Sequence, residues 1–254
     1  MKRIDINCDT GEIAGAIADG SQEGLMAHIT SVNVACGGHA GDESMMRATL
    51  LMAQRWGRQV GAHPGYPDEA NFGRLDVLMS PADIATSIYE QIRALDAIAR
   101  GTGLEIRHVK PHGALYNTAC RNTVVANAIA TGTARWSNQV TLVGLAGSVM
   151  LDVFRDAGFK VAAEGFADRR YESNGTLRPR RLPGALLENP ETAAAQALRM
   201  VRDGSVEASD GSLVHLEVET ICVHGDTPGA ARIAAVVVTR LREAGVTLAA
   251  LGEP

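Results

Sequence analysis

Residues 28–63 read HITSVNVACGGHAGDESMMRATLLMAQRWGRQVGAH and contain the pattern that decides the fold. A β-branched and apolar run (28–35) comes first, a segment with helical spacing of its apolar residues (43–57) follows, and a second apolar run (58–63) ends the stretch. This strand–helix–strand order is typical of two parallel strands joined by a crossover helix. The stretch therefore predicts a βαβ unit.

The same alternation extends over the rest of the chain. Most of the short apolar runs are followed by a segment rich in Ala, Leu and Met with helical periodicity, such as 81–100 after the third run. The seven candidate strands are RIDIN (3–7), HITSVNVA (28–35), RQVGAH (58–63), EIRHVK (105–110), QVTLVGL (139–145), FKVAAEGF (159–166) and LEVETICVH (216–224). Because a barrel of this length is ordinary, we predict an α/β fold, with one parallel barrel domain spanning 1–254.

Helix boundaries and one long loop carry local signals. Ser80 precedes Pro81, and Asn189 precedes Pro190, so each places a capping side chain before a first-turn proline. The last predicted helix, within 227–246, ends at Gly245. The longest irregular stretch, 167–187, follows the sixth strand, where we expect an active-site loop.

Composition excludes several classes of function. The net charge is −5, from 24 basic and 29 acidic residues without a basic block, so we expect no nucleic-acid partner. No run is long enough to span a membrane, and the N-terminus lacks the apolar core of a secretory signal. The four cysteines are far apart without a C-x-x-C pair, which favours reduced thiols and a cytoplasmic location.

Nearly every cluster of polar residues begins close to the end of a predicted strand. In a parallel barrel all strand C-termini open on one face, so residues distant in the sequence converge there. This convergence predicts an enzyme with its active site at that face. The residues are Asn7, Asp9, Glu12, His39, Asp42, His63, Tyr66, Arg74, Lys110, His112, Glu164, Asp168, Arg169, His224 and Asp226.

Lys110 and His112 follow the fourth strand with one proline between them. Strand alternation places both side chains on the same side if the chain stays extended through Pro111. A cation and an imidazole in one cavity can stabilise an oxyanion and transfer a proton near neutral pH. The alternative is a lysine paired with a neighbouring carboxylate beside a capping histidine.

The other strand-end residues are open to two or more interpretations. Asp9 and Glu12 could form a general base with its partner, a hard-cation site, or a carboxylate pair at a helix start. His39 follows a glycine pair and is interpreted as a turn residue or a ligand contact. His63, before Pro64, is interpreted as a ligand contact or a structural hydrogen-bonding group.

Three further features also have a functional and a structural interpretation. Arg169 belongs to a locally basic loop that suits a carboxylate or phosphate, or is simply solvated. Asp226 either serves the site, or caps the last helix or lies near its start. Cys8, Cys36 and Cys222 lie at strand ends without a cationic neighbour in the sequence, so we expect buried apolar residues and not nucleophiles.

Six motifs, taken together and in order, resemble the LamB/YcsF family from about residue 4 to residue 235. They are NCDTGE (7–12), NVACGGHAGD (33–42), GAHPGYPDEANFGR (61–74), VKPHGALYN (109–117), EGFADRRYESNGTLRPR (164–180) and ICVHGDTPGA (221–230). The sequence departs from the usual family pattern at Thr10, Gly38 and Gly65, beside the predicted site, which bears on pocket shape and substrate preference.

The resemblance implies a distorted, seven-stranded barrel similar to the glycoside hydrolase/deacetylase group. It also implies 5-oxoprolinase activity, in which 5-oxo-L-proline is opened to L-glutamate with ATP hydrolysis, together with companion subunits B and C. ATP, with Mg²⁺, is the implied cofactor, although the chain has no P-loop motif. Whether the chain itself binds a metal is left open.

We hypothesise roles for nine residues that match the family motifs. Lys110 and Arg169 would neutralise developing negative charge, while Asp9 or His112 activates water. His39 and His63 would orient the substrate or hold a cation. The predicted catalytic residues are Asp9, Lys110 and His112; the predicted substrate-binding residues are Glu12, His39, His63, Asp168, Arg169 and Asp226.

Two alternatives belong to other classes of function. A stand-alone metal-dependent deacetylase or amidohydrolase could use Asp9, His39 and His63 as ligands. The non-enzymatic alternative is a carrier protein that binds a small acid and passes it to a partner.

Overall fold

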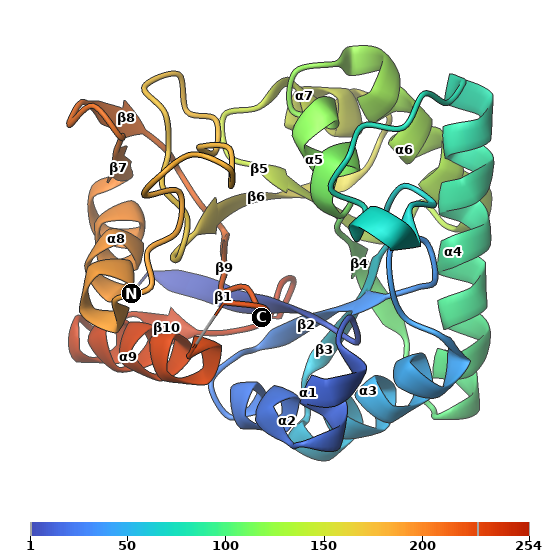
Figure 1. Ribbon diagram of the computed structural model, residues 1–254, viewed down its shortest axis with the longest axis horizontal. Helices are drawn as coiled ribbons and strands as arrows, with labels where there is room; N and C mark the ends of the chain where they lie inside the picture. The colour runs from blue at the N-terminus through green and yellow to red at the C-terminus, as the bar shows by residue number, and fades with distance from the viewer. Residues whose placement is uncertain (1, 228, 254) are drawn as a thin grey trace.

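The structure, a computed structural model, describes residues 2–227 and 229–253 and contains a closed barrel of seven parallel strands (Figure 1). Pro228, in the last of the six motifs, lies outside the described residues. Strand order is β1-β2-β3-β4-β5-β6-β9, and pairing of β1 with β9 closes the ring. The strands are β1 (Arg3–Thr10), β2 (Ser31–Ala35), β3 (Gln59–His63), β4 (Ile106–Val109), β5 (Thr141–Leu145), β6 (Lys160–Phe166) and β9 (Thr220–Cys222). The predicted seven-stranded parallel barrel is confirmed.

Helices surround the barrel, with α8 beside α9 and α4 beside α6 (Figure 1). They are α1 (Ala14–Ala18), α2 (Ser21–Met26), α3 (Glu43–Trp56), α4 (Pro81–Gly101), α5 (Gly113–Ala119), α6 (Thr123–Trp136), α7 (Val149–Asp156), α8 (Pro190–Asp203), α9 (Ala230–Glu243) and the 3₁₀ turn η1 (Glu69–Asn71). No helix within the described ranges has the length and apolar character needed to cross a membrane.

The predicted caps are present. The Ser80 side chain accepts a hydrogen bond from the N–H of Asp83 at the start of α4, and the Asn189 side chain accepts from two amides at the start of α8. The last helix ends at Glu243, and Gly245 follows with a positive φ of 77°. Asp42, predicted among the polar strand-end residues, caps α3 by accepting from the N–H of Met45.

Short elements at the two ends of the barrel were not predicted. A hairpin of β7 (Ser205–Glu207) and β8 (Leu213–His215) follows α8, and β10 (Thr247–Leu248) pairs with the first residues of β1. The final predicted strand, 216–224, contracts to three residues in β9. Strands of two or three residues contain too few side chains for a recognisable alternation.

The inside of the barrel is polar. Along β1, Ile4 and Ile6 alternate with Asp5, Asn7 and Asp9, yet all of them are buried. Hydrogen bonds to residues on other strands of the ring show that the polar side chains point into the barrel. Asn7 donates to Glu164 and Thr220, and Asn33 donates to Asn7 and Asp9. Branched apolar side chains usually fill such a barrel. Here a network of hydrogen-bonded polar side chains fills the interior and extends to the mouth of the barrel.

Candidate active site

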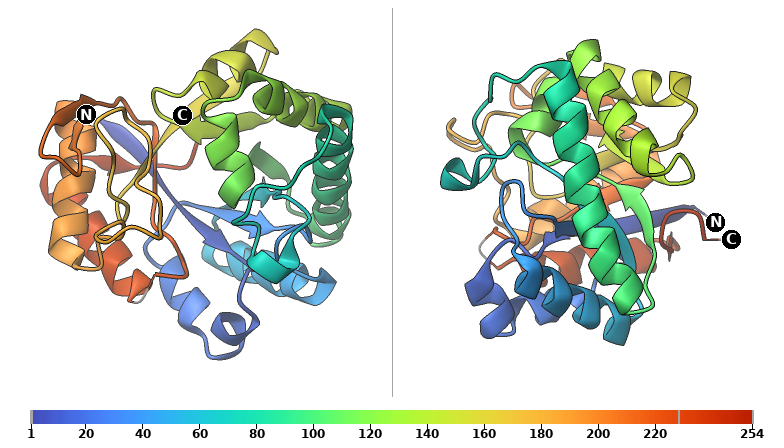
Figure 2. Two further views of the ribbon diagram at one scale, coloured as in Figure 1. Left: turned by 45° about the horizontal axis from the view of Figure 1, so that its top comes forward. Right: turned by 90° about the vertical axis from the view of Figure 1, so that its right-hand side faces the viewer.

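A cavity of about 740 Å³ opens at the C-terminal ends of the strands. The loops that follow β3 and β6 project on this side of the barrel (Figure 2). Seven predicted site residues line the cavity: Asp9, Glu12, His63, Lys110, His112, Arg169 and Asp226. The loop 167–187 contributes several lining residues, which agrees with its interpretation as an active-site loop.

His39 and Asp168 are not among the cavity-lining residues. His39 is fully buried and reaches the site through Glu12, whose Oε1 lies 2.8 Å from His39 Nε2. Asp168 is also fully buried, and its carboxylate accepts from the backbone and ring of His224 and from the hydroxyl of Thr227. That either residue contacts substrate therefore stays a prediction.

Lys110 lies at the centre of the polar network. Its Nζ is 2.8 Å from Asp9 Oδ1, 2.9 Å from Glu164 Oε1 and 3.2 Å from Cys222 Sγ. Burial opposes the charged form, but Asp9 with the other negative neighbours raises the pKa of Lys110 well above its usual value. The lysine is thus paired with carboxylates and shares the cavity with His112, whose side chain makes no capping hydrogen bond at the start of α5. That the pair stabilises an oxyanion or transfers a proton stays a prediction.

Cys222 corrects one premise drawn from the sequence. Although no cation neighbours it along the chain, the fold places Lys110 against its sulfur. Burial nevertheless raises the pKa of the Cys222 thiol well above its usual value. A raised pKa agrees with the expectation that this cysteine is not a nucleophile.

The rings of His63 and His112 lie next to one another at the mouth of the barrel. His63 Nε2 and His112 Nδ1 are 2.9 Å apart, and the ring of His39 stacks on His112 with 3.5 Å between centroids. Glu12 Oε1 is 3.2 Å from His112 Nδ1. Glu12 and the three histidines offer ligand atoms within 4.8 Å of one another, so this cluster could hold a metal; Asp9, Cys222 and His224 form a second such group.

The charges of the two carboxylates depend on these neighbours. Burial alone would raise the pKa of Asp9, but His63 and Lys110 hold it well below its usual value. Burial likewise opposes ionisation of Glu12, whose pKa is lowered by its contacts with the imidazoles of His112 and His39. Both carboxylates are therefore ionised at neutral pH.

The backbone that packs against the imidazoles has an unusual conformation. Phe72 is the one non-glycine residue of the described chain with a positive φ, 56°, and its carbonyl lies 2.9 Å from His112 Nε2. Beside it, a Cβ on Gly73 would lie 2.7 Å from His39 Cβ. Strained backbone of this kind is typical of functional sites.

Arg169 pairs with no carboxylate among the residues that the structure describes. Its Nη2 donates to the carbonyl of Arg178 at 2.7 Å, whereas its buried Nε has no hydrogen-bond partner. Burial, followed by repulsion from Arg180, lowers the pKa of Arg169 to about 10. Such a guanidinium is suited to bind an anion that enters the cavity.

Asp226 belongs to the rim of the cavity. It forms ion pairs with Arg74, which follows β3, and with Arg180 of the loop 167–187. The residue that precedes α9 is Gly229, so Asp226 does not cap that helix. The interpretation of Asp226 as a helix cap was wrong.

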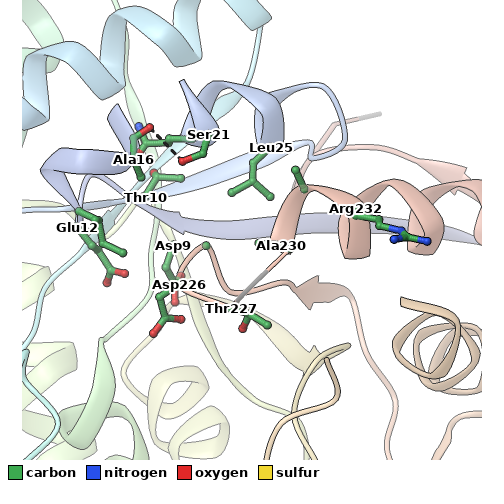
Figure 3. Close-up of a pocket in the computed structure, with 15 residues that line it drawn as sticks. Asp9, Thr10, Glu12, Ala16, Ser21, Leu25, Asp226, Thr227, Ala230 and Arg232 are labelled. Carbon is green, nitrogen blue, oxygen red and sulfur yellow. Dashed lines mark hydrogen bonds between the residues drawn. The ribbon is translucent and has the colours of Figure 1, made fainter. Parts of the chain in front are cut away.

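A second cavity, of about 410 Å³, adjoins the mouth between α2 and the start of α9 (Figure 3). Asp9, Glu12 and Asp226 lie at one side of it, and Leu25 and Arg232 lie toward the helices. Thr10, one of the departures from the family pattern, also lines this space. The carboxylates of the mouth are therefore shared by two cavities.

Three buried polar residues were missed, and a fourth was undervalued. Tyr116 donates to Glu164 Oε2 at 2.7 Å, and His108 Nε2 lies 2.8 Å from Asn33 Oδ1. Glu164 was noted at a strand end but was not included among the site residues. For Asn33 and His108 the signal available in the sequence was a polar residue at alternate positions within otherwise apolar strands, whereas Tyr116 lies in α5 and carried no such signal.

Comparison with known proteins shows to which family the chain belongs. The sequence profile described as the LamB/YcsF family matches residues 4–254. The chain belongs to the LamB/YcsF family. A protein of Chloroflexus aggregans, named as the A subunit of 5-oxoprolinase, is 52% identical over 98% of both chains. A protein of Pyrococcus furiosus with the same name is 45% identical over 99% of this chain and 98% of its own.

A solved structure agrees with the barrel. The crystal structure of a lactam utilization protein from Thermus thermophilus superposes with a TM-score of 0.91 at 41% identity, covering 99% of this chain and 100% of that one. A more distant structure, T48 deacetylase with substrate, covers 97% of this chain and 87% of its own at 15% identity, with a TM-score of 0.47.

Two departures from the usual LamB/YcsF pattern lie close together in space. Gln91 donates to the carbonyl of Gly65 and accepts from its N–H, and a Cβ on Gly38 would lie 2.3 Å from Gln91 Oε1. A Cβ on Gly65 would lie 2.8 Å from His39 Nδ1. Larger residues at 38 and 65 would therefore displace Gln91 or His39, which reaches the site through Glu12.

Proposed function

We propose that this chain is the A subunit of an ATP-dependent 5-oxoprolinase, which opens 5-oxo-L-proline to L-glutamate together with companion subunits B and C. The observation that carries the proposal is the name shared by relatives that are 45–52% identical over nearly the whole chain. The lactam utilization protein of Thermus thermophilus points to the same class of substrate. The cytoplasm, where ATP and reduced thiols are available, is the proposed location.

Two groups of cavity-lining residues suit different parts of the reaction. Arg169 provides a buried cation with an unpaired Nε, and 5-oxoproline has one carboxylate. We place the substrate carboxylate, or a phosphate formed during the reaction, against this guanidinium. Lys110 is less available, because Asp9 and Glu164 already neutralise its charge. Its proposed part is to hold Asp9 ionised within the site.

We place the attacking water next to Glu12, His63 and His112, which line the same cavity. Hydrolysis of an unstrained five-membered lactam is thermodynamically poor, so ATP must drive the reaction. Phosphorylation of the lactam oxygen would make the ring carbon a better electrophile. Since the sequence has no P-loop, we assign the ATP site to the assembled complex.

The test is reconstitution. The chain is incubated with 5-oxoproline and ATP, with and without its companion subunits, and glutamate and ADP are measured. We expect both products, in equal amounts, from the assembled complex alone. Turnover by the isolated chain without ATP would favour the stand-alone amidohydrolase, and binding of 5-oxoproline without any turnover in the complex would favour the carrier.

Arg169→Gln tests the anion site within this assay. Loss of a charged hydrogen bond of about 1.5–3 kcal/mol predicts a rise in KM for 5-oxoproline of roughly 10- to 100-fold. The matched control is Arg170→Gln, because Arg170 is the neighbouring residue and does not line the cavity. Equal KM values for the two variants would remove Arg169 from the substrate site.

A further inference from the structure

The hydrogen atoms on the two facing imidazoles can be assigned from their outer contacts. His63 Nδ1 lies 2.8 Å from the carbonyl of Lys110, and His112 Nε2 lies 2.9 Å from the carbonyl of Phe72. A carbonyl oxygen only accepts, so each of these nitrogens donates an N–H. In neutral rings the other nitrogens, His63 Nε2 and His112 Nδ1, then carry lone pairs that face each other at 2.9 Å.

Two carboxylates add negative charge next to these two nitrogens. Glu12 Oε1 is 3.2 Å from His112 Nδ1 and 3.7 Å from His63 Nε2. Asp9 Oδ2 is 3.3 Å from His63 Nε2, while Lys110 contacts the other oxygen of Asp9. Two lone pairs and two carboxylate oxygens around one point repel each other unless a positive charge lies between them.

We propose that His63 Nε2, His112 Nδ1 and Glu12 Oε1 bind a divalent transition-metal ion, with Asp9 Oδ2 as a fourth ligand. Bonds of about 2.0–2.2 Å to one ion place neighbouring ligand atoms roughly 3.3–3.6 Å apart at the tetrahedral angle and roughly 2.8–3.1 Å apart at a right angle. The two nitrogens are 2.9 Å apart, Glu12 Oε1 is 3.2 Å from His112 Nδ1, and Asp9 Oδ2 is 3.3 Å from His63 Nε2, all in or near these ranges. Glu12 Oε1 lies slightly farther, 3.7 Å, from His63 Nε2. The ligands come from the ends of β1, β3 and β4, which the closed barrel holds in place.

The surroundings are those expected of metal ligands. A ligating histidine donates its other N–H to a carbonyl or carboxylate, which fixes the ring, and ligating carboxylates are themselves hydrogen-bonded. His63 and His112 each contact a carbonyl, and His39 Nε2 contacts Glu12. With its proton on Nε2, His39 leaves a lone pair on Nδ1, in agreement with the absence of any hydrogen-bond partner there. His39 is thus assigned as a positioning residue for Glu12.

The donor set selects the class of ion. Two imidazole nitrogens with carboxylate oxygens suit Zn²⁺, Mn²⁺, Fe²⁺ or Co²⁺, whereas Mg²⁺ and Ca²⁺ prefer oxygen ligands. This ion is therefore distinct from the Mg²⁺ that accompanies ATP. All four ligand residues line the larger cavity, so a substrate oxygen or a water molecule can reach the ion. Metal binding at this point does not depend on the proposed function.

The experiment measures binding of the metal alone. The full-length chain, prepared without a histidine tag and stripped with a chelator, is titrated with Zn²⁺ by calorimetry and with Co²⁺ by visible absorption. We expect one ion per chain and Co²⁺ bands typical of nitrogen and oxygen ligands. His63→Gln and His112→Gln should each weaken binding by more than the roughly 10- to 100-fold that loss of an outer contact costs. His39→Gln should fall within that range.

The matched control is His215→Gln, because His215 is an exposed histidine in β8. It should bind Zn²⁺ as the wild type does. The proposal is overturned if the stripped wild-type chain takes up no Zn²⁺ or Co²⁺ at micromolar concentrations, and a proton shared between His63 and His112 then supplies the positive charge. It is also overturned if the His63→Gln/His112→Gln double variant binds as tightly as the wild type. The wild-type titration decides the matter even if a variant fails to fold.

Discussion

Asp5 and Asp9 lie on the same strand, four residues apart, and both point into the barrel, yet their ionisation differs. Asp9, at the mouth, contacts Lys110 and His63, and these two side chains hold its pKa well below the usual value. Asp5 lies deeper, and its hydrogen-bond partners are the hydroxyls of Thr30, Ser31 and Thr220. Burial dominates there and raises the pKa of Asp5 to about 6.

The difference shows which kind of partner a buried carboxylate needs. Hydroxyls supply hydrogen bonds to Asp5 and lower its pKa, but they do not overcome the loss of hydration. A neighbouring ammonium and imidazole do so for Asp9. The Asp9 carboxylate at the mouth therefore stays ionised in mildly acidic solution, whereas the deeper Asp5 carboxylate becomes protonated there.

Removing the cation at the mouth should have the largest effect. Lys110→Met leaves Asp9 and Glu164 buried without a positive partner, so we expect the free energy of unfolding at pH 7 to fall by about 3–5 kcal/mol. Denaturant unfolding followed by circular dichroism measures the change, with Lys160→Met at an exposed position as the control. The loss should shrink at pH 5, where the stranded carboxylates can take up protons. A loss independent of pH would show that packing, not charge, is responsible.

Titration of Asp5 should give the next largest effect. Because its folded pKa, about 6, lies above the ordinary value of 3.8, the folded state holds the proton more tightly. This contribution to stability is complete below about pH 4 and is lost as pH rises to about 6, a change on the order of 3 kcal/mol. Asp5→Asn should remove this part of the slope. Parallel curves for wild type and variant from pH 4 to pH 6 would show that Asp5 does not titrate there.

Thr220→Val should have a smaller effect of the same origin. The substitution keeps the shape of the side chain but removes a donor to Asp5, so the pKa of Asp5 should rise further. We expect about 1–3 kcal/mol of lost stability at pH 7 and less at pH 4, where Asp5 is neutral. Unfolding curves at the two pH values provide the measurement, and an equal loss at both would contradict the explanation.

The rim should be the least sensitive of the charged regions. Asp226 pairs with Arg74 and Arg180 near solvent, where side-chain exposure is 15% for Asp226 and 42% for Arg74. Asp226→Asn should therefore change the free energy of unfolding by less than about 1 kcal/mol, and added salt should reduce even this. A change as large as that of Lys110→Met would mean that the rim is as dehydrated as the barrel interior.

Local signals explain what could be predicted. The caps at Ser80 and Asn189 and the strand–helix alternation depend on neighbouring residues, so the sequence alone defines them. Convergence at the mouth followed from the parallel topology, and alternation through Pro111 correctly placed Lys110 and His112 in one cavity.

Contacts between distant strands could not be predicted. Asn33 and His108 bond to each other inside the barrel although 75 residues separate them. An alternating strand normally indicates one face in water, and no local signal distinguishes water from a polar barrel interior. For the same reason the sequence did not reveal that His39 lies behind Glu12, or that Cys222 contacts Lys110.

Closure of the barrel between β1 and β9 also has a consequence for how the chain folds. Asp5 and its partner Thr220 are 215 residues apart, so β1, the first strand of the barrel in chain order, pairs with β9, the last strand of the ring. Contacts of such long sequence separation slow folding, because much of the chain must be ordered before they form. Asp9 meets Lys110 only after 101 further residues have been made. Until then the Asp9 carboxylate lacks the ammonium group that helps to hold its pKa low in the folded protein.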